Sequence, residues 1–205
     1  MAAPITHIAL TAKIFDKFFK DKNKKDFFIG SCFPDIRYLK VIEREKTHFD
    51  NLTIADLKDN DAFTTGLKFH SILDIAREKY IVENDTYSLC PKSEYATTSL
   101  KLLEDELYYA SITNWSEYIE YLKEISTDEI NIGININDVK KWHNLLNCYF
   151  QTKPSTKSIT DFMHGIYFTD DVIREIFKNL DIMRTNKKII EILKNLYKNF
   201  DTLIT

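Results

Sequence analysis

The segment DAFTTGLKFHSILDIAREKYIV, residues 61–82, shows most directly which fold this sequence adopts. Its apolar residues recur at the three- and four-residue spacing of a helix, and no proline interrupts them. These apolar positions are Leu67, Phe69, Ile72, Leu73, Ile75 and Ala76. We therefore predict a long helix that begins at Asp61 and ends near Val82.

The rest of the chain is predicted to be helical as well. Only four glycines and four prolines occur in 205 residues, whereas strand-rich folds need frequent glycine-containing turns. Further helices are predicted at residues 5–19, 93–112, 115–126, 137–151, 158–167, 170–182 and 185–203. Loops are expected at residues 43–60 and, in extended form, at residues 131–137. The predicted fold class is all-α, a compact bundle of about eight helices in one domain spanning residues 1–205.

Composition and charge indicate which classes of protein this chain can belong to. Hydrophobic residues make up 44% and charged residues 29%, which is typical of a globular chain rather than a disordered one. The net charge is −3 and basic residues are spread along the chain, so we expect no nucleic-acid partner. Three widely spaced cysteines without a CxxC pair indicate reduced thiols. Without a signal peptide or a membrane-length apolar run, we predict a soluble, cytoplasmic protein.

Two ionisable residues interrupt the apolar face of the long helix. His70 and Asp74 are four residues apart, so their side chains project from one face, and such a pair can bind one metal ion. The alternative is a structural histidine–aspartate hydrogen bond. Gly66, one turn earlier, leaves room for another helix or for a substrate.

Three further positions are candidate ligands, each with a structural alternative. Asp35 follows a proline at the end of an apolar run in FFIGSCFPDIRYL, residues 27–39, where it is alternatively a helix cap or turn residue. His48 lies in REKTHFD, residues 44–50, where it is alternatively an exposed loop residue. His7 lies in PITHIAL, residues 4–10, where it is alternatively half-buried on an amphipathic helix.

In this order along residues 4–80, these segments resemble the bacterial zinc-dependent phospholipase C family. The resemblance implies an all-α, phospholipase C/P1 nuclease-like fold and zinc that activates water against a phosphodiester. It also implies roles for the five residues. Asp35, His48, His70 and Asp74 would bind one zinc, His7 would bind a neighbouring zinc that Asp74 bridges, and Asp35 would also be the catalytic base.

The sequence departs from the family pattern at three places. The family has a later H-x-x-x-E helix, but here Asn147 stands four residues after His143 and Phe168 stands four residues after His164. The family's N-terminal amino ligand and tryptophan are replaced by the start Met-Ala-Ala, so we expect that contribution to be missing. One or two zinc ions are therefore predicted, with Mn or Fe as alternatives, and His143 and His164 remain additional candidate ligands.

The predicted function is hydrolysis of a phosphodiester in a small molecule or a lipid headgroup. Arg37, Arg44 and Arg77 are the candidate phosphate contacts, and surface solvation is the alternative for each. A different class of function also fits, namely a non-catalytic helical binding or scaffold protein that retains a vestigial or structural metal site. The sequence leaves the oligomeric state open.

Overall fold

The computed structural model describes residues 2–205, and every regular element in that range is helical. The described residues form ten α-helices, which are α1 (Pro4–Phe18), α2 (Lys24–Cys32), α3 (Ala62–Glu83), α4 (Ala96–Tyr108), α5 (Trp115–Tyr121), α6 (Thr127–Asn131), α7 (Ile136–Phe150), α8 (Thr156–Gly165), α9 (Asp170–Thr185) and α10 (Lys187–Leu203). Five 3-10 helices join them, namely η1 (Phe33–Leu39), η2 (Arg44–Lys46), η3 (Ile54–Leu57), η4 (Thr86–Leu89) and η5 (Tyr109–Ser111). The predicted all-α class is confirmed, and the helices beyond the expected eight are the short α2 and α6.

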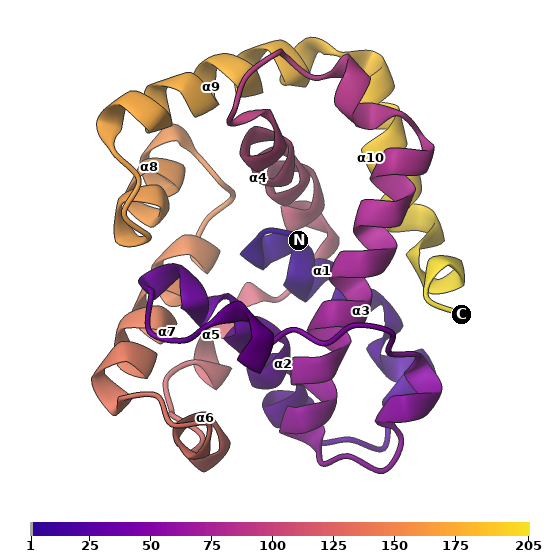
Figure 1. Ribbon diagram of the computed structural model, residues 1–205, viewed down its shortest axis with the longest axis vertical. Helices are drawn as coiled ribbons and strands as arrows, with labels where there is room; N and C mark the ends of the chain where they lie inside the picture. The colour runs from indigo at the N-terminus through magenta and orange to yellow at the C-terminus, as the bar shows by residue number, and fades with distance from the viewer. Residues whose placement is uncertain (1) are drawn as a thin grey trace.

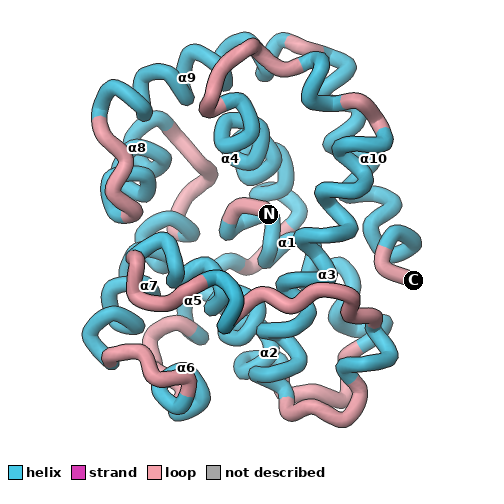
Figure 2. The backbone as a smooth tube through the Cα atoms, viewed as in Figure 1, coloured by secondary structure: helices cyan, strands magenta, loops and turns pink. Residues whose placement is uncertain are grey.

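The helices enclose the start of the chain. Figure 1 shows α9 along one end of the molecule and α10 down one side, with α1 and α4 between them. Figure 2 shows that only short loops connect most helices. Within residues 2–205, none of the helices combines the length and the apolarity that crossing a bilayer requires.

Helices α2 and α3 cross closely, and this crossing positions the candidate ligands that lie on α3 and just after α2. A Cβ atom at Gly66 would lie 2.0 Å from the carbonyl oxygen of Phe27, and one at Gly30 would lie 2.1 Å from that of Phe63. The two backbones are therefore closer than any side chain at these positions would allow. The space predicted at Gly66 is thus filled by a helix and not by a substrate.

Buried aromatic rings hold α1 against this helix pair. Phe19 lies with its ring centroid 4.7 Å from that of Phe27 and 5.5 Å from that of Phe69. Phe15 contacts Phe27 from the same side, at 5.2 Å. Aromatic pairs at these separations are favourable beyond the area that they bury. The side chains that α1 and α3 present to each other are consequently held by a packed core.

Local structure differs from prediction at the two expected loops. The segment 43–60 contains η2 and η3, so it is tightly turned rather than open. The loop expected at residues 131–137 is shorter than that range, because α6 ends at Asn131 and α7 begins at Ile136; Asn135 within it has an extended backbone. Gly133 has a φ of 93° in this turn, and the Asn135 side chain caps α7 by accepting from the Asn137 N–H.

Candidate metal centre

The five predicted ligands converge although they come from distant segments. His7 lies on α1, Asp35 on η1 and His48 just after η2, while His70 and Asp74 lie one turn apart on α3. All five are buried, and the most exposed of them, His48, is 7% exposed. Histidine and aspartate side chains are seldom gathered in a core without a function.

Asp74 is at the centre of the cluster. Its Oδ1 lies 3.3 Å from Nε2 of His7, and its Oδ2 lies 3.5 Å from Nε2 of His70 and 3.8 Å from Nε2 of His48. Asp35 lies on the other side, with its two oxygens 3.9 Å from Nε2 of His7 and 4.0 Å from Nε2 of His70. Ligands of a tetrahedral zinc ion are separated by about 3.3–3.5 Å, given zinc–ligand bonds of about 2.0–2.2 Å. The shortest of these separations match that geometry.

Hydrogen bonds at the other ring nitrogens orient two of the imidazoles. Nδ1 of His70 lies 2.9 Å from the Ser31 carbonyl oxygen, to which it donates, so Nε2 carries the lone pair. Nδ1 of His48 lies 3.0 Å from the Thr47 hydroxyl. Both Nε2 atoms therefore face the cluster. In metal sites, a hydrogen bond at the other ring nitrogen orients a histidine ligand in the same way.

Buried polar atoms without hydrogen-bond partners indicate whether a metal ion fits in this cluster. Among the described residues, Nε2 of His70, Nε2 of His48 and Oδ1 of Asp35 are buried without a hydrogen-bond partner. Each such group costs about 1–3 kcal/mol when nothing satisfies it. Two sets of ligand atoms lie within 4.8 Å of one another, His7–His70–Asp74 and Asp35–His48–His70. The donors are nitrogen and carboxylate oxygen, which suit zinc and related divalent ions.

Burial keeps two of the histidines neutral. It lowers the pKa of His48 to about 4 and holds the pKa of His70 well below its usual range. The positive charge that His7 would carry lowers the pKa of His70 further. A metal-binding imidazole must be neutral, so both rings are in the required state near pH 7.

The two carboxyl groups respond differently to burial. Burial raises the pKa of Asp35, and the nearby Asp74 carboxylate adds to that increase. Burial also acts to raise the pKa of Asp74, but interactions that include the hydrogen bond from His7 outweigh it and hold that pKa well below the usual range. Asp74 is therefore the firmly anionic member of the cluster.

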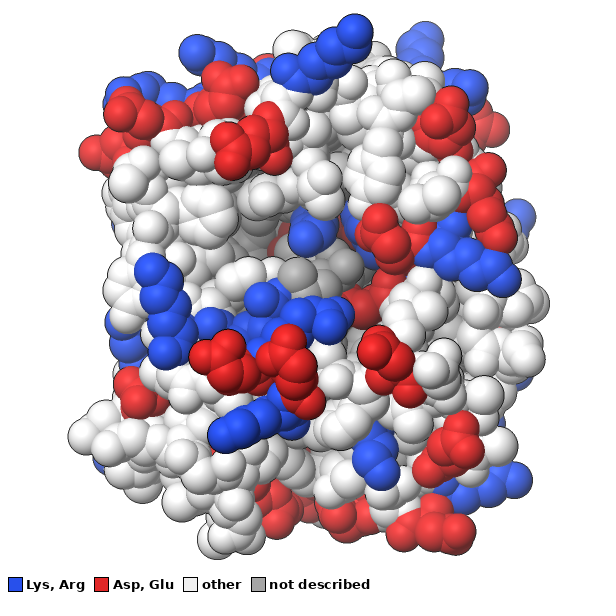
Figure 3. Space-filling model, in the orientation of Figure 1, with Lys and Arg blue, Asp and Glu red and all other residues white. Residues whose placement is uncertain are grey.

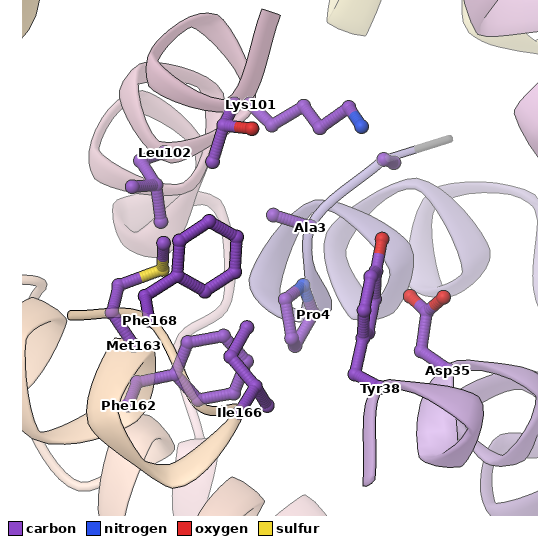
Figure 4. Close-up of a pocket in the computed structure, with 12 residues that line it drawn as sticks. Ala3, Pro4, Asp35, Tyr38, Lys101, Leu102, Phe162, Met163, Ile166 and Phe168 are labelled. Atoms are coloured by element: carbon purple, nitrogen blue, oxygen red, sulfur yellow. The ribbon is translucent and has the colours of Figure 1, made fainter. Parts of the chain in front are cut away.

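A pocket adjoins the cluster at Asp35. It lies between the start of α1, η1, α4 and the end of α8 and is partly open to solvent. Figure 4 shows the Asp35 carboxylate and the Tyr38 ring on one side and Lys101 on another. The remaining wall is largely apolar and is formed by Leu102, Phe162, Met163, Ile166 and Phe168. The face drawn in Figure 3 is hollowed near its centre, with Lys and Arg side chains gathered beside the hollow.

Two of the three predicted phosphate contacts lie near this region. Arg37 has its guanidinium 3.7 Å from Oδ1 of Asp35 and 4.3 Å from the centre of the Tyr38 ring. Arg44 lies on η2 and lines a surface pocket together with Arg37 and Lys40. Both remain candidates for contact with an anion.

Arg77, the third predicted contact, has a different role. Its side chain is 0% exposed and its guanidinium donates to both carboxylate oxygens of Glu104, which is equally buried. Its Nη1 also donates to Glu78 and to the Tyr87 hydroxyl. Arg77 is therefore part of an internal ion pair, and the prediction that it contacts substrate is corrected.

The two additional histidines lie outside the cluster. His143 is buried, with Nε2 2.7 Å from Oε1 of Glu129 and Nδ1 3.0 Å from the Leu122 carbonyl oxygen. Its contacts join α7 to α6 and to the turn before α6. His164 lies near the surface on α8, with Nε2 2.9 Å from Asp170. Their prediction as metal ligands is therefore corrected.

Sequence reasoning missed two groups at the site. Lys101 lines the pocket beside Asp35, but nothing distinguishes it in sequence from the other basic residues among the 28 lysines and arginines. The Ala2 backbone N–H donates to Oδ1 of Asp74 at 2.6 Å, so the start of the described chain reaches the cluster, where no contribution from it was expected. The Ala2–Asp74 hydrogen bond joins residues 72 positions apart in sequence.

Comparisons with protein-family models, with curated proteins and with solved structures find no match to this chain.

Proposed function

We propose that the protein is a metal-dependent phosphodiester hydrolase of the phospholipase C-like kind, with a phospholipase C/P1 nuclease-like fold. The main support is the convergence of five buried histidine and aspartate side chains beside a pocket. Among the described residues, Nε2 of His48, Nε2 of His70 and Oδ1 of Asp35 also lack a hydrogen-bond partner. The all-helical architecture and the order of these residues along the chain support the family resemblance.

One or two metal ions would be bound by two overlapping sets of residues. One set is Asp35, His48 and His70, and the other is His7, His70 and Asp74. A divalent ion held there supplies the positive charge that polarises a phosphoryl oxygen and activates water. Zinc is the ion we propose, with manganese or iron as alternatives that accept the same donors.

Asp35 is the residue that we propose as the base. Of the five cluster residues, it is the one that also lines the pocket, so its carboxylate is positioned to accept a proton from the attacking water. It lies in the first turn of η1, directly after Pro34, and is held between His7, His70 and Arg37. A base held in this way needs little reorganisation during the reaction.

The pocket and its charges indicate the kind of substrate. A dication would balance the negative charges of Asp35 and Asp74, and Arg37 would leave the region positive. Such a site favours an anion like the phosphodiester of a small molecule or a lipid headgroup. The apolar side chains of α8 would hold an uncharged substituent and exclude water.

The experiment that tests the proposal measures metal content and phosphodiester hydrolysis together. Wild type, His70→Ala, Asp35→Asn and the control His164→Ala would be loaded with zinc, dialysed, analysed for metal and assayed with bis(4-nitrophenyl) phosphate. We expect wild type and the control to bind zinc and hydrolyse the ester. His70→Ala should lose both properties, and Asp35→Asn should lose hydrolysis. A folded wild type that hydrolyses the ester after complete removal of metal would refute the proposal.

One observation favours a second function, that of a non-catalytic protein with a structural metal. The five cluster side chains are at most 7% exposed, as in closed structural sites. The same experiment separates the two functions. Zinc that is retained by wild type without hydrolysis of any phosphodiester tested would favour the structural role.

A further inference from the structure

Lys101 lies across the pocket from the cluster. It is on α4, whereas Asp35 and Tyr38 are on η1, and the two elements form different walls of the same pocket. Figure 4 shows the Lys101 side chain extending from α4 along the top of the pocket, toward the side where the Asp35 carboxylate lies. Its ammonium group is therefore available to whatever occupies the pocket.

The ammonium group of Lys101 has no close partner in the part of the chain that the structure describes. Among the described residues it forms neither a hydrogen bond nor an ion pair, although it is half-buried. Arg77, one helix away, is by contrast fully paired with Glu104. A partly buried charge normally acquires a partner, because desolvation is costly. Burial, helped by the charge of Arg77, lowers the pKa of Lys101, while Asp35 and other nearby carboxylates oppose the decrease.

The local charge balance indicates what that partner would be. Asp35 and Asp74 are the carboxylates of the cluster that favour a charged Lys101. In the proposed function their charge is balanced by a metal dication, so they would no longer neutralise the lysine. The positive charge of Lys101 would then face the pocket, and an anion would satisfy it.

We propose that Lys101 is the phosphate-binding residue of this pocket, and that its ammonium contacts a phosphoryl oxygen on the side opposite Asp35. This inference rests on the proposed function and identifies how the site holds the anionic part of its substrate. A lysine suits the role because it binds phosphate as a point charge on a flexible stem. The neighbouring apolar wall then holds the substituent of the phosphate.

The test measures the affinity for inorganic phosphate by calorimetry. Zinc-loaded wild type would be compared with Lys101→Met, which keeps an unbranched apolar side chain without the charge, and with Lys101→Arg, which keeps the charge. Lys153→Met, at an exposed position, is the matched control. We expect Lys101→Met to bind phosphate about tenfold more weakly or worse, since a charged hydrogen bond is lost. Lys101→Arg should keep most of the affinity, and the control should match wild type.

Zinc content and the kinetics of bis(4-nitrophenyl) phosphate hydrolysis are measured on the same samples. Equal zinc content with a raised KM in Lys101→Met supports phosphate binding. Unchanged phosphate affinity in Lys101→Met overturns the role of Lys101 and leaves the proposed hydrolase intact. Loss of zinc in that variant also overturns it, because Lys101 would then support the metal centre instead.

Repeating the phosphate titration without metal shows which of the two proposals fails, the metal-dependent hydrolase or the phosphate-binding role of Lys101. If wild type takes up no zinc, the proposed function fails. A phosphate affinity that still depends on Lys101 would then support the inference on its own, and no phosphate binding in either state would overturn it.

Discussion

The imidazole rings of His7 and His70 stack face to face, with centroids 3.9 Å apart and planes inclined by 9°. Two protonated rings at this separation would repel each other strongly in a buried site. The contact thus favours a neutral His70, in agreement with the direction in which burial moves its pKa. It also joins α1 to α3 at the cluster, so an ion bound there would be coupled to the packing of these helices.

Metal binding is expected to stabilise the fold. Zinc at about 100 times its dissociation constant would add about 2.7 kcal/mol, which is about 5–10 °C in Tm for a chain of this size. The physical reason is that the ion would bind the Nε2 atoms of His48 and His70, which have no hydrogen-bond partner among the described residues. Differential scanning calorimetry with zinc and with a chelator measures the shift. His70→Ala should abolish it and His164→Ala should retain it; an equal shift in both variants would contradict the predicted site.

Arg77 is expected to matter for folding and not for substrate affinity. Arg77→Met leaves Glu104 buried without its partner, which should lower the free energy of unfolding by about 3–5 kcal/mol. Adding Glu104→Leu removes the unpaired charge and should recover much of the loss. Urea denaturation of the two variants and wild type measures this. A normally stable Arg77→Met protein with a raised KM would restore Arg77 as a substrate contact.

The helix crossing at Gly66 should not tolerate a methyl group. Gly66→Ala would place a Cβ 2.0 Å from the Phe27 carbonyl oxygen, so α2 and α3 must separate. We expect a loss of about 1–3 kcal/mol or more in the free energy of unfolding. Gly165→Ala is the matched control, because there the new methyl meets the flexible Leu145 side chain. Similar losses in the two variants would show that the crossing is not the cause.

Asp105 should make the fold less stable as the pH rises. It is buried where it accepts hydrogen bonds from the backbone N–H and the hydroxyl of Thr6, and burial raises its pKa to about 7. Between about pH 4 and pH 7 the folded state then binds more protons than the unfolded state, so this group costs up to about 1.4 kcal/mol per pH unit as the pH rises.

The measurement compares wild type with Asp105→Asn, which keeps an acceptor for Thr6 but does not titrate. Urea denaturation at several values between pH 4.5 and pH 8 gives the free energy of unfolding of each. The advantage of wild type over the variant should decrease as the pH rises through this range. A constant difference would show that Asp105 does not titrate in the folded state.

Much of the helical content could be predicted from the sequence. The predicted helix from Asp61 to Val82 is α3, and the Asp61 side chain caps it by accepting from the Thr64 N–H. Its periodic apolar residues also place His70 and Asp74 on one face, because a spacing of four residues is a property of the helix itself. The loops were less predictable, since η2 and η3 are too short to show a periodic apolar pattern.

The roles of individual charged residues could not be predicted in the same way. Arg77 and Lys101 are both basic residues on helices. Arg77 forms a buried ion pair with Glu104, whereas Lys101 lines the pocket. His143 and His7 are both buried, yet one is paired with Glu129 and the other joins the cluster. The role of each of these side chains depends on the residue that it contacts, and that residue lies on a different helix or loop.

The sequence by itself determined the all-helical class, the long helix α3 and the pairing of His70 with Asp74 on its face, because local periodicity and steric preference along one segment are enough for these. Only the tertiary structure decided that His7, Asp35 and His48 meet that pair, and that Lys101 shares a pocket with Asp35. These contacts depend on the approach of α2 to α3 and on the packing of α1 and α4 around them. Such packing is a property of the whole core, and no single segment encodes it.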